Sequence, residues 1–122
     1  MIEIEIRKFM TSKLECPIVF ELAPKMPDKF VLIQKTGSSK RNKLLASTFA
    51  FQSYGKSMYE ASLLNETVKE IVEQLVELNN VSDVSLNSDY NYTDTESKKY
   101  RYQAVFDIRH LYNSNAIYCN RT

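Results

Sequence analysis

Few side chains in this sequence have the types and spacing that catalysis requires. His110 is the only histidine, and a catalytic histidine works with a positioned Ser, Cys, Asp or Glu. Asp107 is three residues away, so on a strand the two side chains point to opposite faces. Cys16 precedes Pro17 and is expected to be a small, partly buried residue rather than a reactive thiol. The sequence therefore predicts a surface histidine at a strand end and no catalytic constellation.

A polar, basic segment at residues 36–43 is the first candidate binding element. Its eight residues are more than a tight hairpin needs, and it lacks the G-x-x-x-x-G-K-[ST] spacing of a phosphate-binding loop. A basic loop of this kind could reach toward an acidic partner or nucleic acid. A plain solvent-exposed hairpin loop fits equally well. The candidate partner-facing residues are Lys35, Ser38, Ser39, Lys40, Arg41 and Lys43.

Four tyrosines form the second candidate binding element. Tyr90, Tyr92, Tyr100 and Tyr102 are expected to cluster across one hairpin. Tyrosine combines a large apolar ring with a hydrogen-bonding tip and is enriched at protein interfaces. Cross-strand aromatic pairing within the sheet is the alternative. The length and two-sided pattern of the segment favour an interface.

Length, composition and charge indicate an ordinary globular domain. The chain has 122 residues, of which 43% are hydrophobic and 25% charged, and its formal net charge is +1. A protein that binds nucleic acid through phosphates usually has a strong basic excess. No apolar run is long enough to span a bilayer, and Glu3 and Glu5 stand where a signal peptide needs cations. We therefore expect a chain made in a cytoplasm, without membrane contact, in which Cys16 and Cys119 are free thiols.

Hydrophobic periodicity predicts an α+β fold. Residues 56–78 have an apolar stripe at helical spacing and a second face rich in glutamate, which is expected to be solvated rather than to bind a metal or cofactor. Most other segments alternate with period two. The predicted elements are helices at 2–14 and 56–78, and strands at 18–22, 30–35, 44–54, 81–93 and 99–111. The expected architecture is a single-layer, mostly antiparallel sheet packed against two helices, in the order α-β-β-β-α-β-β. We expect residues 1–111 to form one domain and residues 112–122 to form a flexible tail.

Three stretches of the sequence resemble a known family. FVLIQKTGSS, FAFQSYGKSMYEASLLNE and LNSDYNYTDTESKKYRYQAVFDI are similar to tail-completion or tail-terminator proteins of Gram-positive long-tailed phages and prophages, and the resemblance runs over residues 2–108. It implies a structural protein of the virion rather than an enzyme. Such proteins form a ring, commonly a hexamer, at the head-proximal end of the tail tube, where they stop tube growth and offer a surface to the head connector.

The resemblance also implies roles for the basic segment. Carried over by position, Lys40, Arg41 and Lys43 would lie at a surface that faces a partner or the ring lumen, where they would meet passing DNA without reading its sequence. The first alternative is a head–tail connector of the stopper or adaptor type. Less favoured alternatives are a small nucleic-acid-binding module and a small enzyme that uses His110 with tyrosine, Arg101 or Arg109.

Overall fold

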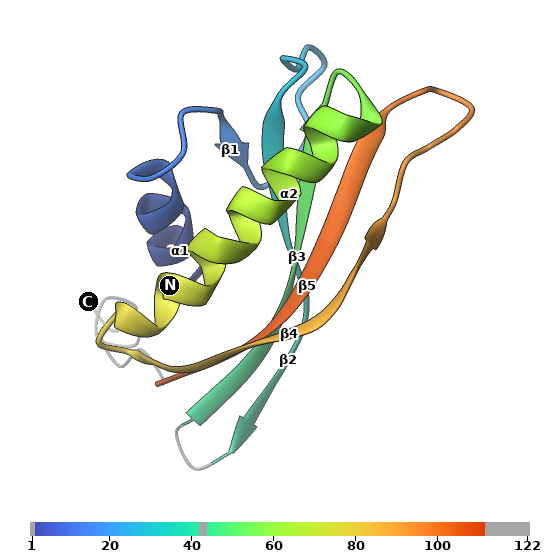
Figure 1. Ribbon diagram of the computed structural model, residues 1–122. Helices are drawn as coiled ribbons and strands as arrows, with labels where there is room; N and C mark the ends of the chain where they lie inside the picture. Colours follow the sequence, from blue (N-terminus) through green and yellow to red (C-terminus); the bar gives the residue numbers. More distant parts are fainter. Residues whose placement is uncertain (1, 42–43, 112–122) are drawn as a thin grey trace.

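The computed structural model describes residues 2–41 and 44–111, which form one sheet with a layer of helices on one face (Figure 1). The elements in chain order are α1 (Ile2–Thr11), β1 (Ile18–Val19), β2 (Phe30–Arg41), β3 (Leu44–Gly55), α2 (Met58–Glu73), the 3-10 helix η1 (Gln74–Glu77), β4 (Val81–Asn91) and β5 (Tyr100–Leu111). The predicted α+β class is confirmed. The expected order did not include η1, which continues α2 by one turn.

The sheet has five strands in the order β1-β2-β3-β5-β4. The pairs β2–β3, β3–β5 and β4–β5 are antiparallel, whereas β1 pairs with β2 in parallel. The sheet is therefore mixed, and the helices add a second layer, so the expected single-layer arrangement is wrong in these respects. The parallel pair arises because the long connection from β1 to β2 lets the chain return in the same direction.

Helix α2 begins at a capping box. The Oγ of Ser57 accepts a hydrogen bond from the Glu60 amide at 3.1 Å, and the Glu60 carboxylate accepts one from the Lys56 amide at 3.2 Å. The first bond satisfies an amide group that the first helical turn leaves without a partner, and the second ties the residue before the cap to that turn. The apolar stripe predicted for this segment is buried along α2 and η1: Ala61, Leu64, Val68, Ile71, Val72 and Leu75.

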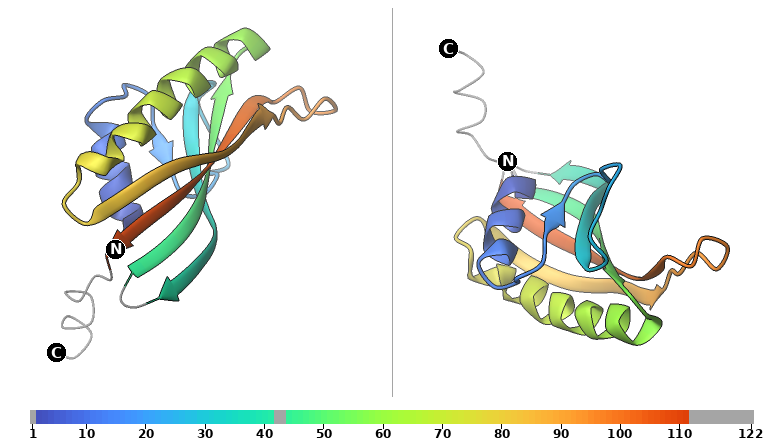
Figure 2. Two further views of the ribbon diagram at one scale, coloured as in Figure 1. Left: turned by 60° about the horizontal axis from the view of Figure 1, so that its bottom comes forward. Right: turned by 90° about the horizontal axis from the view of Figure 1, so that it is seen from above.

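The stripe of α2 packs against three buried phenylalanines of the central strands. Phe49 and Phe51 come from β3, and Phe106 comes from β5. The rings of Phe51 and Phe106 meet edge to face at 5.9 Å. Helix α1 adds Ile2, Ile6 and Met10 to the same core, so both helices cover the same face of the sheet (Figure 2).

Strand β1 is shorter than predicted. It ends at Val19, and Phe20 and Leu22, which the sequence placed in a strand, are 41% and 47% exposed. The Nε of Arg7 donates to the Ile18 carbonyl at 2.8 Å, and its guanidinium lies over the Phe20 ring. Only Val31 and Leu32 of β2 find partners in β1. Most of the outer edge of β2 therefore lies beyond the reach of β1.

The two glycines provide a matched test of the packing between β3 and α2. A Cβ on Gly55 would lie 2.6 Å from the Ala61 backbone nitrogen, whereas a Cβ on Gly37 would meet nothing within 4 Å. We expect Gly55→Ala to lower the free energy of unfolding by about 1–3 kcal/mol, because the first turn of α2 must move. Gly37→Ala should change it by less than about 0.5 kcal/mol. Urea denaturation of both variants measures the difference, and equal effects would contradict this close contact.

Candidate interaction surfaces

Residues 36–41, which the sequence predicted as part of a loop, belong to strand β2. Gly37 pairs with Thr48 and Arg41 pairs with Leu44, after a bulge between Lys35 and Gly37. The prediction failed because this part of the hairpin is exposed on both sides and has no apolar alternation to mark it as a strand. Residues 42 and 43, and with them Lys43, lie outside the described residues.

The far ends of β2 and β3 extend past the helix layer, at the bottom of Figure 1. We call this part of the β2–β3 hairpin, residues 36–41 and 44–48, the hairpin extension. Lys35, just before it, is exposed, as are Ser38, Ser39 and Lys40 within it. The Thr36 hydroxyl donates to the Thr48 carbonyl at 3.2 Å and ties the two strands together near the bulge.

Within the described part of the chain, β2 beyond Leu32 has no strand partner on its outer side. An edge strand presents a row of unpaired amide and carbonyl groups, and lysines on such an edge oppose unspecific pairing. Lys35 and Lys40 lie on this edge strand. All of the predicted partner-facing residues except Lys43, which lies outside the described residues, belong to this preformed edge strand, where an extended segment of another chain can add by backbone hydrogen bonds.

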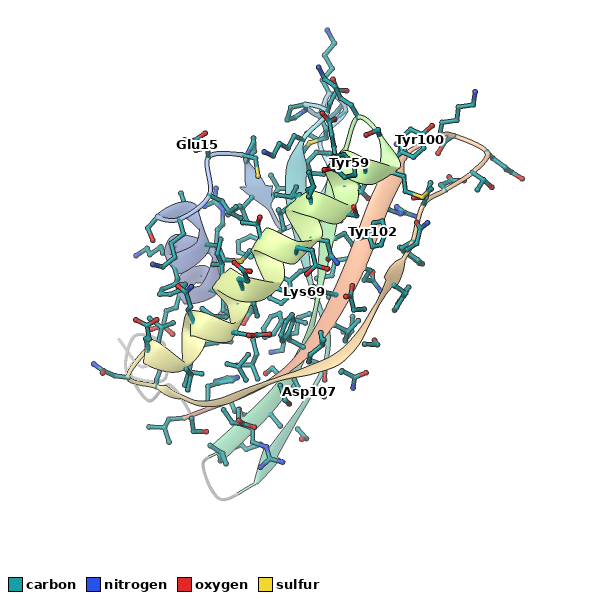
Figure 3. The ribbon with its side chains drawn as sticks, in the orientation of Figure 1. Glu15, Tyr59, Lys69, Tyr100, Tyr102 and Asp107 are labelled. Atoms are coloured by element: carbon teal, nitrogen blue, oxygen red, sulfur yellow. The ribbon has the colours of Figure 1, made fainter. Side chains whose placement is uncertain are left out.

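The sheet face without helices carries a ladder of hydrogen-bonded polar side chains. Thr48 donates to Asp107 at 2.7 Å, and Asn87 of β4 donates to the same carboxylate at 3.0 Å. Because the charged form accepts both bonds, the pKa of Asp107 is lowered. Figure 3 labels Asp107 on this part of the sheet.

Glutamines continue this ladder toward the other end of the sheet. The Gln52 amide donates to Gln103 at 2.8 Å and to Gln34 at 3.4 Å, and Gln103 in turn donates to the Tyr90 hydroxyl. Gln52 is buried although no helix covers this face, because its neighbours on β2 and β5 enclose it. The ladder orients side chains across four strands and gives this face a defined polar surface.

The four predicted tyrosines do not form one cluster. Tyr90 and Tyr92 pack edge to face at 5.9 Å and are 41% and 44% exposed. Tyr102 alternates in register with Ala104 and Phe106, which places it on the side of the helices, and Tyr100 lines a separate pocket at the start of β5. Figure 3 labels both at their places along β5. The sequence could not show this division, because β4 has register shifts that change its alternation.

Arg101 holds the exposed tyrosine pair in place. Its Nε donates to the Tyr92 carbonyl at 2.7 Å, and a terminal nitrogen donates to the Tyr54 hydroxyl at 3.0 Å. Its guanidinium also lies 4.5 Å from the centroid of the Tyr92 ring, within range of a cation–π interaction. Tyr90 and Tyr92 are thus preorganised at the outer strand β4, which lowers the entropic cost of a contact there.

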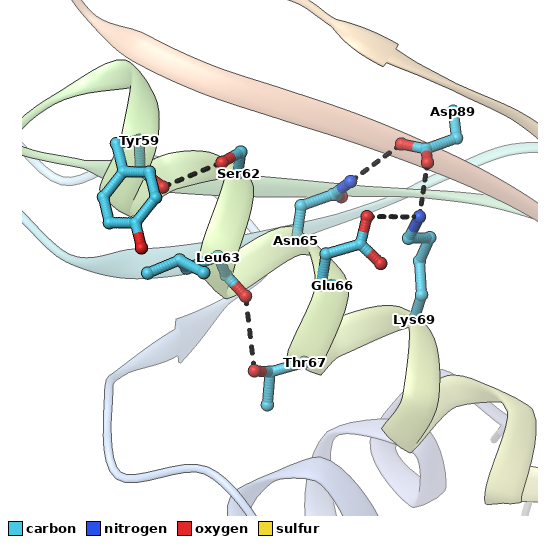
Figure 4. A network of polar contacts seen from close by, with 8 residues as sticks. All are labelled: Tyr59, Ser62, Leu63, Asn65, Glu66, Thr67, Lys69 and Asp89. Atoms are coloured by element: carbon cyan, nitrogen blue, oxygen red, sulfur yellow. Dashed lines mark hydrogen bonds and ion pairs between the residues drawn. The ribbon is translucent and has the colours of Figure 1, made fainter.

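A second polar network joins α2 to β4 (Figure 4). The Asp89 carboxylate accepts hydrogen bonds from the Asn65 amide at 2.7 Å and from Lys69 at 2.6 Å, and Lys69 also pairs with Glu66 at 2.9 Å. The hydrogen bond to Asp89 is the main reason that the pKa of Lys69 is raised. The network fastens the edge strand β4 to the helix layer, and its two carboxylates share the single ammonium group of Lys69.

His110 is buried, which overturns the prediction of a surface histidine. It is 3% exposed, and its Nε2 is hydrogen-bonded to the Ser47 hydroxyl at 2.9 Å. Burial lowers its pKa. The alternation of Phe106 and Ile108 on the core face of β5, continued by two residues, places His110 on that same face. Asp107 lies on the opposite face, as predicted, so the two do not form a catalytic pair.

The buried histidine predicts a pH dependence of stability. Because its pKa is lower in the folded state than the unfolded value of about 6.5, the unfolded chain binds more protons between the two values. Stability should therefore fall as pH drops from 7 to 5. Thermal melts of wild type and His110→Gln check this: the variant, with no group titrating at this position, should show a smaller change. An equal change in both would contradict a buried neutral histidine.

No protein-family model matches the chain, and no curated protein matches its sequence.

Among residues 2–41 and 44–111, no group of three or more His, Cys, Asp or Glu side chains is arranged to hold a metal ion. No helix in the described part of the chain is long and apolar enough to cross a membrane.

Proposed function

We propose that this chain is a phage tail terminator or completion subunit. In this role it caps the head-proximal end of the tail tube within the virion, joins the tube to the head connector, and has no enzymatic activity. The proposal rests on the resemblance of residues 2–108 to that family. The observation that carries it is the exposed, basic outer edge of β2, which continues past the helix layer as the hairpin extension.

A ring of identical subunits needs a contact in which one surface meets a different one. The two outer strands of the sheet supply such a pair. One is β2, with Lys35 and Lys40 beyond the short β1, and the other is β4, which carries the exposed Tyr90 and Leu86. Addition of the β2 edge of one copy to the β4 edge of the next would continue the sheet from subunit to subunit. A closed ring of six such contacts is the arrangement we propose.

If the β2 edge pairs through its backbone groups, the side chains of the hairpin extension still point to the two faces of the sheet, where they can contact the tube, the connector or the lumen. Lys40 brings positive charge to it, Lys35 adds a second positive charge just before it, and Ser38 and Ser39 bring hydrogen-bonding hydroxyls. In a ring, six copies of this basic hairpin would also meet DNA passing through the lumen, as a contact without sequence preference. Tyr90 and Tyr92 supply apolar area at the other edge strand.

The test is the size and shape of the particles that form in solution. Light scattering over a concentration series, with negative-stain imaging, should show rings with an open centre, either alone or after mixing with purified tail tubes. The double variant Lys35→Glu/Lys40→Glu should abolish the rings. The control Lys8→Glu/Lys25→Glu carries the same charge change at exposed positions off the sheet edge and should leave them intact.

Thermal melts of both variants should show the wild-type midpoint, which would establish that each remains folded. A strict monomer at every concentration that also fails to bind tail tubes would contradict the proposal, and so would equal loss of rings in the two variants.

The same surfaces also suit the alternative role of a head–tail connector of the stopper or adaptor type, since either role needs a ring with two docking faces. Capture on immobilised tube protein, compared with capture on the portal-side adaptor, separates the two. A terminator binds the tube protein more tightly, whereas a connector binds the adaptor more tightly.

A further inference from the structure

A pocket of about 360 Å³ lies at the end of the sheet opposite to the hairpin extension. Three segments far apart in the sequence form its walls: the connection from β1 to β2, the junction of β3 with α2, and the turn from β4 to β5. Figure 3 labels Tyr100 where β5 begins, at the same end of the molecule as the first turn of α2. The volume is at the lower end of the range for small-molecule sites.

The floor of this pocket is apolar and rigid. Phe30 and Tyr54 are 4% and 5% exposed, and their rings stack with centroids 4.2 Å apart and planes 12° from parallel. Met26 packs against them, and Pro24 and Pro27 restrict the backbone of the wall above. Because the two rings stack on each other and are buried, neither has a free face on which a nucleobase could stack. They can instead contact an apolar group.

The rim of the pocket is cationic. Lys56, Lys98 and Lys99 line it and are exposed, and none of them forms an ion pair with a carboxylate of residues 2–41 or 44–111. Asp28 is the one carboxylate in the lining. Three ammonium groups around one small apolar pocket repel each other, and an anion bound between them would offset this repulsion.

The backbone at Lys98 supports a role for its side chain. Lys98 has a φ of 55° and is the only residue other than glycine with a positive φ in the described ranges. A left-handed conformation costs a lysine about 1 kcal/mol, whereas glycine adopts it freely and asparagine readily. Asp94 stiffens the turn by accepting hydrogen bonds from the Ser97 hydroxyl at 2.7 Å and from the Glu96 amide at 3.1 Å. The turn thus holds a lysine where turn chemistry prefers glycine.

We propose that this pocket binds a small organic anion, with its apolar body against the floor of Phe30 and Met26 and its phosphate or carboxylate between Lys56, Lys98 and Lys99. This binding site goes beyond the proposed function and does not depend on it, because it lies at the opposite end of the sheet from the hairpin extension.

The probe for the first test is phenyl phosphate, which joins an apolar ring to a dianion. In a titration followed by amide NMR shifts, it should bind saturably and shift the signals of Tyr54, Lys98 and Lys99. Inorganic phosphate lacks the apolar body and benzyl alcohol lacks the charge, so each should bind at least about tenfold more weakly, the equivalent of losing one favourable contact.

Variants of Lys98 separate binding from folding. Lys98→Gly and Lys98→Asn both accept the left-handed backbone, so they should keep or raise the thermal midpoint while weakening phenyl phosphate at least about fivefold, as expected for the loss of one charged hydrogen bond. Lys25→Gly is the matched control, since Lys25 is an exposed lysine in the same region that does not line the pocket. It should bind the probe as wild type does.

Several results would overturn this proposal. Equal affinity for inorganic phosphate and phenyl phosphate would mean that surface charge alone attracts the anion. Unchanged binding in both Lys98 variants, or shifts that never saturate, would exclude the pocket. Tighter binding of a hexaglutamate peptide than of phenyl phosphate would replace a small ligand with an acidic protein segment.

Discussion

The burial of one apolar stripe of α2 against the phenylalanines of β3 and β5 is the contact on which the rest of the structure depends. A buried phenylalanine contributes about 1.5–3 kcal/mol relative to exposure, and Phe49, Phe51 and Phe106 are all fully buried in this contact. The stripe packs on phenylalanines of both β3 and β5, which lie side by side in the sheet. After α2, the chain therefore forms the outer strand β4 first and then returns as β5 to the position between β3 and β4. One face is thereby covered and the other is left open.

Two parts of the sheet beyond this contact, the hairpin extension and the polar ladder, depend mainly on strand pairing and polar hydrogen bonds. The antiparallel strands β2 and β3 are longer than the helix layer, so the hairpin extension is held by its strand pairing rather than by a core. On the open face, Asp107 and the glutamine ladder satisfy one another across strands, which keeps that face ordered without an apolar cover. The result is a sheet with exposed edges, the feature on which the proposed assembly role depends.

Elements with a clear hydrophobic periodicity could be predicted from the sequence. Features that depend on tertiary contacts could not. The α2 stripe from Ala61 to Leu75 was foreseen because apolar spacing marks it. Strand β2 beyond Lys35 was not, because a polar strand exposed on both sides looks like a loop. His110 could have been found by extending the alternation of β5. The lysine-rimmed pocket could not, because three distant segments form it and the φ of Lys98 leaves no trace in the sequence.

Amide hydrogen–deuterium exchange, measured on the chain alone and mixed with purified tail tubes, tests most directly whether the open sheet edges carry assembly. The account predicts that mixing slows exchange in β2 from Ile33 to Arg41 and in β4 around Leu86–Asn91, while the buried amides of α2 stay unchanged. Unchanged exchange along both edges in the presence of bound tube, or slowing confined to the helix layer, would contradict it.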